Sequence, residues 1–306
     1  MTGYRQLPLG ANLWLRSQIL RAIRAFFHRR EYLEVETPCR IPAPAPELYI
    51  DAEPAGEWYL QTSPELCMKR LLSAGFPRIY QICRCFRRQE RGARHLPEFT
   101  LLEWYTAGAG YREMMTECED LIRFVVRAST GKGSLTFNQR RISLQKPWER
   151  LTVAEAFACY GSIPLEKALT SGRFDEMMGC EIEPQLGMER PVFVYDYPAE
   201  LGALARLKPQ DASLAERFEL YIAGMEICNA FTELTDPVEQ RLRFEQVNRT
   251  RTAQGEDAYP LPEHFLIALS DMPSAAGNAL GVDRLVMLLA GAQAIDDVVA
   301  FVPETL

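Results

Sequence analysis

The stretch from residue 78 to residue 105 constrains the fold of this chain more than any other. Residues 78–86 and 97–105 both have the apolar, aromatic and β-branched composition of strands, and a basic run separates them. Two strands joined by such a connection predict a long antiparallel hairpin. Alternate side chains of a strand face the same way, so Glu103 and Tyr105 are predicted to share a space with the arginines of the hairpin loop.

Helices and further strand pairs are predicted along the rest of the chain. Apolar residues at helical spacing predict helices over about 12–30 and 111–128. Capping residues predict the starts of three more helices, at Ser63-Pro64, at Thr152 with Glu155, and at Asp236-Pro237 with Glu239.

The chain is predicted to form one domain. No repeat, low-complexity tract or linker divides the 306 residues. The proline-rich run "PCRIPAPAPE" at 38–47 predicts an extended connection and a candidate mobile loop. We therefore expect a single α+β domain over residues 1–306, with an antiparallel sheet flanked by helices.

Composition excludes several classes of protein. The net charge of −7 and the pI near 5.3 argue against binding nucleic acid through bulk positive charge. The eight cysteines lack the paired spacing of a zinc site, and we expect reduced thiols in a cytoplasmic protein. The chain shows neither a signal peptide nor an uncharged stretch long enough for a membrane helix, so we expect a soluble protein.

The sequence also limits the chemistry. The P-loop, dinucleotide-binding and serine-hydrolase signatures are absent, and the chain has only three histidines. Histidine-based nucleophilic catalysis is therefore not indicated. Adenylation suits such a chain because it can run on positioning and charge neutralisation instead of a catalytic base.

Two glutamates of a second predicted hairpin are candidate metal ligands. A turn at Ala223-Gly224 places Tyr221 opposite Glu226. Glu219 then lies diagonally beside Glu226 on the same face. Two close carboxylates repel unless a cation lies between them, and Mg²⁺ is commonly held by carboxylate oxygens together with phosphates. The same spacing also suits two solvated glutamates that share no ligand.

The basic loop and Glu233 each have two interpretations. Arginine forks bind phosphate and carboxylate at two points, so the loop predicts a nucleoside triphosphate site that uses magnesium, or else a solvated or protein-docking patch. Glu233 is flanked by Phe231 and Leu234. A carboxylate buried there needs a cationic partner, which is either a protein arginine or a substrate amine.

Several stretches together resemble the class II aminoacyl-tRNA synthetases, and the lysyl enzymes most closely. "YLEVETP" resembles motif 1 (about 33–38), "CRCFRRQERGARHLPEFTLLEWY" motif 2 (about 80–105) and "GVDRL" motif 3 (about 277–290). "TSPELCMKRLL" and "ERFELYIAGMEICNAFTELTDP" match the intervening lysyl-type sequence. The resemblance implies the class II catalytic fold and a homodimer with Pro38 at its interface.

Two features resemble the stand-alone paralogues of lysyl-tRNA synthetase more closely. Lysyl-tRNA synthetases carry an N-terminal anticodon-binding domain, whereas about eleven residues precede the first predicted helix here. Motif 3 has Ala279 where the lysyl enzymes have glycine; one methyl group can shift substrate choice by roughly 1 to 3 kcal/mol, although a neutral exchange is the alternative. Those paralogues adenylate (R)-β-lysine with ATP and attach it to a lysine of elongation factor P, which implies that tRNA is not a partner.

The resemblance implies a role for each matching residue. Arg87 would meet the α-phosphate of ATP and the substrate carboxylate, and Arg284 the γ-phosphate, as the two catalytic residues. Glu219 and Glu226 would hold Mg²⁺. The implied substrate-binding residues are Ser63, Pro64, Glu65, Tyr105, Asn229, Glu233 and Ala279. The implied ATP-binding residues besides the two arginines are Arg88, Gln89, His95, Leu96, Phe99, Glu226, Ile227 and Gly281.

Two positions depart from the family pattern. Motif 2 usually reads Phe-Arg-Asn-Glu, whereas Arg88 and Gln89 follow Arg87 here; glutamine still accepts a hydrogen bond through its carbonyl. Leu96 replaces an asparagine, so one nucleotide contact is expected to be missing. Two other functions stay open: an enzyme that charges α-lysine or a related diamino acid onto another carrier, and a catalytically inactive regulatory subunit.

Overall fold

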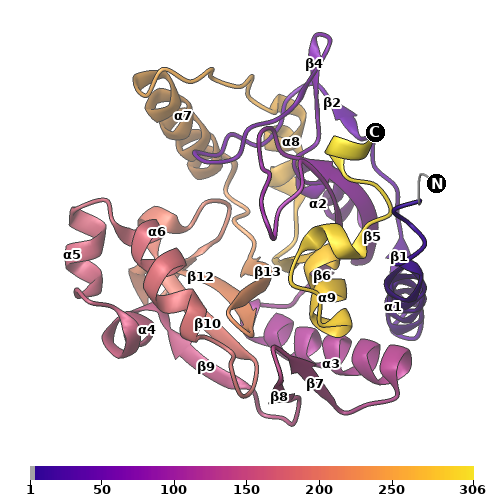
Figure 1. Ribbon diagram of the computed structural model, residues 1–306. Coiled ribbons are helices and arrows are strands. Elements are labelled where there is room, and N and C mark those ends of the chain that lie inside the picture. The colour runs from indigo at the N-terminus through magenta and orange to yellow at the C-terminus, as the bar shows by residue number, and fades with distance from the viewer. Residues whose placement is uncertain (1–3) are drawn as a thin grey trace.

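A mixed sheet of nine strands runs through the centre of the protein (Figure 1). The computed structural model describes residues 4–306, and the strands are counted within that range. The order across the sheet is β1 (Leu33–Glu34), β5 (Arg78–Phe86), β6 (Glu98–Ala107), β14 (Ala275–Gly281), β13 (Met225–Thr232), β12 (Asp211–Ile222), β10 (Val192–Pro198) and β9 (Glu149–Thr152), with β11 (Leu207–Lys208) beside β12. The predicted antiparallel pairing is confirmed in the centre, whereas β1 with β5 and β9 with β10 are parallel.

Helices cover both faces of this sheet. One face carries α1 (Gly10–His28), α3 (Tyr111–Thr130) and α9 (Val282–Ala290). The opposite face carries α2 (Glu65–Ser73), α7 (Pro237–Ala253) and α8 (Glu263–Ala268) at one end and α4 (Val153–Tyr160), α5 (Leu165–Thr170) and α6 (Phe174–Met177) at the other. Between these two groups, β6, β14, β13 and β12 present polar residues.

Two small sheets lie outside the central one. Strands β2 (Arg40–Ile41), β4 (Trp58–Leu60) and β3 (Pro54–Ala55) form one, and the predicted strand pair near 135–144 forms the other as β7 (Ser134–Phe137) and β8 (Arg140–Ser143). No helix within residues 4–306 combines the length and the apolar character needed to cross a membrane.

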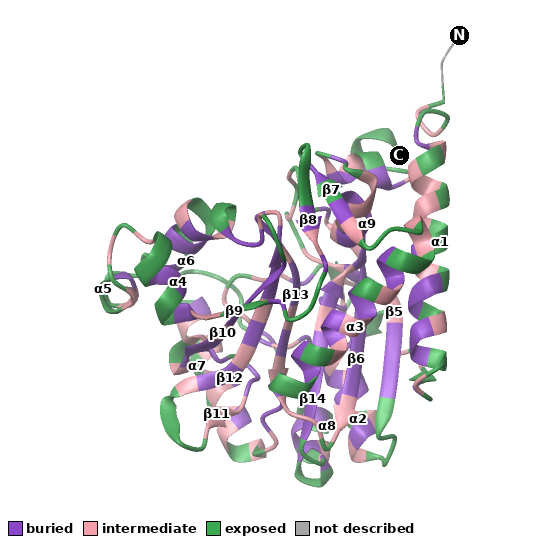
Figure 2. Cartoon of the chain, turned by 90° about the horizontal axis from the view of Figure 1, so that it is seen from below, coloured by how far each residue is buried: buried purple, intermediate pink, exposed green. Residues whose placement is uncertain are grey.

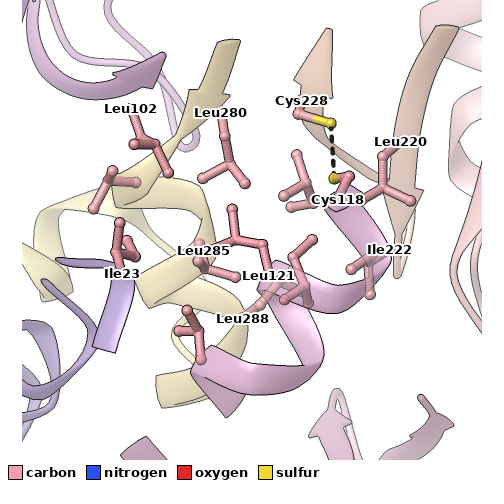
Figure 3. Packing of buried hydrophobic residues seen from close by; sticks show 14 of the residues in the cluster. Ile23, Leu102, Cys118, Leu121, Leu220, Ile222, Cys228, Leu280, Leu285 and Leu288 are labelled. Carbon is pink, nitrogen blue, oxygen red and sulfur yellow. Dashed lines mark hydrogen bonds between the residues drawn. The ribbon is translucent and has the colours of Figure 1, made fainter. Parts of the chain in front are cut away.

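The main hydrophobic core lies between the sheet and the face covered by α1, α3 and α9. Figure 2 shows the buried residues along the central strands and on the inward sides of these helices. Strand alternation sends Leu102 and Trp104 into this core and Glu103 and Tyr105 to the opposite face, as predicted. Figure 3 shows core side chains of α1, β6, α3, β14 and α9 meeting, among them Ile23, Leu102, Leu121, Leu280 and Leu285.

The predicted helix caps are confirmed at two helices and shifted by one residue at a third. Asp236 accepts hydrogen bonds from the backbone N–H of Val238 (2.8 Å) and Glu239 (3.1 Å) at the start of α7. Thr152 and Glu155 form the expected reciprocal capping box. Ser63 accepts from the N–H of Glu65 at 3.0 Å, but α2 begins at Glu65 because Pro64 occupies the capping position itself.

The second predicted hairpin is confirmed with its register. Ala223 and Gly224 have φ of 54° and 66°, the left-handed pair that suits a two-residue turn, and Tyr221 pairs with Glu226. A bulge between Leu220 and Tyr221 was not predicted. Because one strand gains a residue there, Ile227 and Cys228 both enter the core while Glu226 avoids it.

The proline-rich connection is tied down by a buried arginine. Arg251 of α7 donates to the carbonyl of Glu47 (2.9 Å) and pairs with Asp51 (2.6 Å). The N–H of Ala52 donates to the hydroxyl of Tyr259 at 2.9 Å. These contacts hold the connection against the end of the β5–β6 hairpin, where the N–H of Arg88 donates to the carbonyl of Asp51.

Leu285→Ala tests the main core. Leu285 is fully buried in α9, so the variant should lose about 2 to 5 kcal/mol of unfolding free energy through lost transfer energy and a residual cavity. Leu242→Ala is a matched control because Leu242 is 57% exposed on α7, and its change should stay within about 0.5 kcal/mol. Urea denaturation of both variants measures this difference; equal losses would contradict the described packing.

Candidate active site

The site lies on the sheet face opposite the main core, between α2 and the group α4–α6. Strand alternation and register bring the polar side chains of four strands to this face. Ala279 of β14, for example, pairs with Asn229 of β13 and with Glu103 of β6. The site has two parts, a buried cluster of carboxylates next to α2 and an arginine-rich part next to α9.

Lys69 organises the buried cluster. Its ammonium group contacts Glu65, one helical turn earlier on α2, and Glu233, which follows β13, with 2.5 Å to Oε2 of Glu233. The Lys69 side chain is completely buried. Burial alone would lower its pKa, but the pKa is raised because Glu233 and Glu65 stabilise the charge. Lys69 therefore stays protonated as an internal counter-ion.

Glu103 lies beside this ion pair. Its carboxylate accepts hydrogen bonds from the hydroxyls of Ser63 (2.5 Å) and Tyr105 (2.8 Å). Burial, and then repulsion from Glu65, raises the pKa of Glu103 to about 8. Burial likewise raises the pKa of Glu233 to about 8, although Lys69 opposes the shift. One lysine therefore does not offset the burial and mutual repulsion of these carboxyl groups, and the protonated forms of Glu103 and Glu233 are favoured below about pH 8.

Glu233 keeps one oxygen for a further partner. Within residues 4–306, no donor hydrogen-bonds its buried Oε1. A buried carboxylate oxygen without a donor is costly, which makes it a receptor for an incoming cation. Gly277 permits this arrangement, since a Cβ there would lie 2.3 Å from Oε1 of Glu233 and 2.4 Å from the ring of Tyr105.

The arginine-rich part centres on Arg87 and Arg284. The Arg87 guanidinium lies 5.0 Å from the ring centre of Phe99 and 3.6 Å from Glu90. Arg284 donates to Glu226 (3.0 Å) and lies 2.6 Å from Nε2 of His95. Burial lowers the pKa of His95, with Arg284 adding to the shift, so a neutral ring is favoured.

The two predicted metal ligands occupy different surroundings on this face. Glu219 accepts from the hydroxyls of Tyr197 (2.7 Å) and Tyr221 (2.5 Å) and pairs with Arg217 (2.7 Å). Glu226 pairs with Arg284, and its pKa is lowered because Arg284, Arg87 and Arg217 together outweigh the effect of burial. These contacts exclude, for Glu219, the alternative of a solvated glutamate on the surface.

The donor set fits magnesium only together with phosphates. Residues 4–306 contain no group of three or more metal-ligating side chains placed to hold an ion. Mg²⁺, however, commonly takes one or two carboxylates and completes its shell with waters and substrate phosphates. Burial, followed by repulsion from Glu226 and Glu219, raises the pKa of nearby Glu183 to about 7. The charges of Glu226 and Glu219 therefore act on Glu183 as well.

Other predicted residues surround these two parts. Arg88 and Gln89 are exposed at the hairpin tip, with Gln89 in the left-handed region at φ 63°. A Cβ on Gly281 would pack against Arg284 at 3.7 Å. The side chains of Leu96 and Ile227 lie in the main core. A contact of either residue with a nucleotide would therefore come from its backbone, and their role in ATP binding stays a prediction.

The basic run divides between binding and structure. Arg91 forms ion pairs with Asp296 and Glu304 near the C-terminus, and Arg94 donates to the carbonyl of Gly224 at 2.7 Å. Arg84 pairs with Glu98 within the hairpin. Three arginines of the run thus hold the fold.

Sequence reasoning missed four charged residues of the site. Lys69 occupies the place predicted for an arginine beside Glu233, and its spacing of four from Glu65 was the available signal. Arg217 joins Glu219 to Asn229, whose Oδ1 accepts at 3.1 Å. Glu183 and Glu47 approach from outside the central strands, and no local pattern marks either residue.

The chain belongs to the class II tRNA synthetases. The family described as "tRNA synthetases class II (D, K and N)" matches residues 2–305. The chain is similar to proteins named elongation factor P–(R)-β-lysine ligase. It is 40% identical to that of Edwardsiella ictaluri (strain 93-146), 39% to that of Proteus mirabilis (strain HI4320) and 40% to that of Erwinia tasmaniensis (strain DSM 17950), each match covering 95% of this chain and 94% of the relative.

The raised pKa of Glu103 predicts a pH-dependent stability. The pKa of Glu103 is about 8 in the folded protein and 4.5 ordinarily. Proton binding by Glu103 therefore contributes fully to the unfolding free energy below about pH 4.5, and this contribution is lost as the pH rises through 8. Glu103→Gln cannot ionise. Relative to the unmodified protein, its unfolding free energy should therefore increase between about pH 5 and 8.5, by up to about 1.4 kcal/mol per pH unit.

Urea denaturation across this pH range measures the difference. Glu176→Gln is the control, because Glu176 is exposed on α6 and pairs with Arg173. Its curve should not rise relative to the unmodified protein. Parallel curves for Glu103→Gln and the unmodified protein would show that Glu103 does not bind a proton in the fold.

Proposed function

We propose that this protein activates (R)-β-lysine with ATP as an aminoacyl adenylate and transfers it to a lysine side chain of elongation factor P. One observation carries the proposal: the sheet face that carries the buried carboxylate cluster, with an open receptor at Glu233, also carries Glu226, which pairs with Arg284 and has its pKa lowered by Arg284 and Arg87. A β-lysine has a carboxylate at one end and two amino groups, which match these two parts. The names of the relatives support the same substrate and acceptor.

The buried cluster supplies recognition of the amino groups. The two ammonium groups of the substrate would meet Glu65 and Glu233, with Tyr105 and Glu103 beside them. An ammonium that leaves water needs a charged partner there, since an unpaired buried charge is strongly unfavourable. Asn229 is held by Arg217 and would orient the substrate over Ala279. Ser63 and Pro64 close the pocket at the start of α2.

The arginines supply the positioning of the reacting groups. Arg87 would hold the substrate carboxylate and the α-phosphate together, so the carboxylate oxygen attacks the α-phosphorus and pyrophosphate leaves. Arg284 would bind the γ-phosphate as the charge moves to pyrophosphate. Mg²⁺, held by Glu219 and Glu226 with the phosphates, would shield the triphosphate charge. No side chain has to remove a proton, because the carboxylate is already ionised.

The second step completes the ligation. The free amine of the acceptor lysine attacks the carbonyl carbon of the adenylate, an amide bond forms and AMP leaves. We further propose that the protein acts in the cytoplasm as a homodimer through motif 1. The exposed apolar side chain of Leu33, on β1 within motif 1, is consistent with such an interface.

A second candidate is activation of α-lysine for another carrier. The pocket charges favour it equally, because α-lysine also has two amino groups and one carboxylate. The two candidates differ in where the first amino group lies, and Ala279, which pairs with Asn229 and Glu103 in the sheet, would lie beside that group. An inactive regulatory subunit is less consistent, because the sequence retains Arg87, Arg284, Glu219 and Glu226 on one face.

Ligation itself is the direct test. Purified protein with ATP, Mg²⁺, (R)-β-lysine and unmodified elongation factor P should add one β-lysyl group to a single lysine, measured by intact-mass and peptide mass spectrometry. Pyrophosphate exchange across a panel of amino acids then compares (R)-β-lysine with α-lysine. An unmodified acceptor would contradict the proposal, and α-lysine as the far better substrate would favour the second candidate.

Arg87→Ala should abolish adenylation and leave the fold intact. Removing a charged group that acts in the transition state typically costs at least 10²-fold in rate. Arg249→Ala is the control, since the Arg249 side chain is 61% exposed on α7. Pyrophosphate exchange and circular dichroism measure the two effects; exchange retained in a folded Arg87→Ala variant would remove Arg87 from the reaction.

A further inference from the structure

Lys69 is an unusual component for a pocket that binds amines. Its ammonium group is fully buried between Glu65 and Glu233, where a substrate ammonium of the same charge must also come. Burying a lysine is costly even when the lysine is paired, and a buried salt bridge often contributes little to stability. Its position therefore requires an explanation beyond packing.

The charged groups around Lys69 come from several elements. Its own helix contributes Glu65, the segment after β13 contributes Glu233, and β6 contributes Glu103 and the hydroxyl of Tyr105. The ring centres of Phe231 and Phe265 lie 5.2 Å and 5.9 Å from the ammonium nitrogen. Three carboxylates and one lysine leave the ionised cluster with two net negative charges. Two net charges match a substrate with two ammonium groups.

Lys69 also leaves part of each neighbouring carboxylate for other partners. It contacts Oε1 of Glu65 and Oε2 of Glu233, whereas Oε1 of Glu233 has no donor within residues 4–306. Gly277 keeps that oxygen and Tyr105 in place, because any side chain there would collide with both. One fixed ammonium therefore holds two carboxylates as separate receptors.

We infer that Lys69 is the positioning residue that sets the charge of the amine pocket, holding Glu65 and Glu233 apart as receptors for an amino acid with two ammonium groups. The inference rests on the proposed function. Lys69 does not touch the reacting atoms. It acts by orienting the carboxylates and by lowering the pH at which they ionise, because without its positive charge the neighbouring carboxylates would hold their protons to a still higher pH.

Lys69→Met, which keeps the length of the side chain and removes its charge, tests the inference. Pyrophosphate exchange with (R)-β-lysine is measured between about pH 6.5 and 9.5. In the unmodified protein KM should fall as the pH rises and level off once the carboxylates are ionised. In Lys69→Met, the pH at which KM for (R)-β-lysine becomes constant should be higher by about one unit or more. Near neutral pH this KM should therefore be about tenfold higher, while KM for ATP should change less than about twofold.

Lys208→Met is the matched control. Lys208 is also largely buried and pairs with Asp196 at 2.5 Å, away from the amine pocket. Its variant should keep the unmodified pH profile. A lysine that only supports packing would lower thermal stability and kcat without moving the levelling pH, and that result for Lys69→Met overturns the inference.

Two further outcomes are decisive. If Lys69→Met does not fold, the charge-balanced double variant Lys69→Met with Glu233→Gln should fold, because its ionised cluster again has two net negative charges. Failure of both variants to fold assigns Lys69 to packing and overturns the inference. If the unmodified protein exchanges pyrophosphate with no diamino acid, the proposed function fails. Exchange by the unmodified protein with an unshifted profile in Lys69→Met overturns the role of Lys69 alone.

Discussion

The ion pair between Lys69 and its two glutamates is the interaction on which the rest of the site depends. A fully buried ammonium, two buried carboxylates and the partly buried Glu65 are unfavourable together unless each charge has a partner in a fixed place. The sheet supplies that fixed place, because β6 and β14 run side by side beneath the cluster and Gly277 allows Glu233 and Tyr105 to meet.

The division of the sheet into two faces explains how one fold serves both packing and chemistry. Leu102 and Trp104 belong to the core, and Glu103 and Tyr105, their neighbours in β6, belong to the site. The bulge at Ile227 applies the same division to β13, since it turns two successive side chains into the core and frees Glu226 for the opposite face. Substrate groups can then be bound by residues whose backbones are fixed by the core.

Much of this arrangement could be predicted from local patterns. The turn at Ala223-Gly224, the cap at Asp236 and the β5–β6 hairpin each depend on residues adjacent in sequence. Lys69 could not be assigned in the same way, because its main partner Glu233 is distant in the chain and only the tertiary fold joins them. The burial of the Leu96 and Ile227 side chains in the core was also not predicted, since the position of a residue in a motif does not tell which way its side chain faces.

A crystal structure of the protein with (R)-β-lysine and a non-hydrolysable ATP analogue tests the central claim most directly. The account predicts the two amino groups of β-lysine within about 3 Å of Glu65 and Glu233, with Lys69 still between these glutamates and the substrate carboxylate at Arg87. A substrate bound with its amino groups away from both glutamates, or with its carboxylate in the buried cluster, would contradict the account.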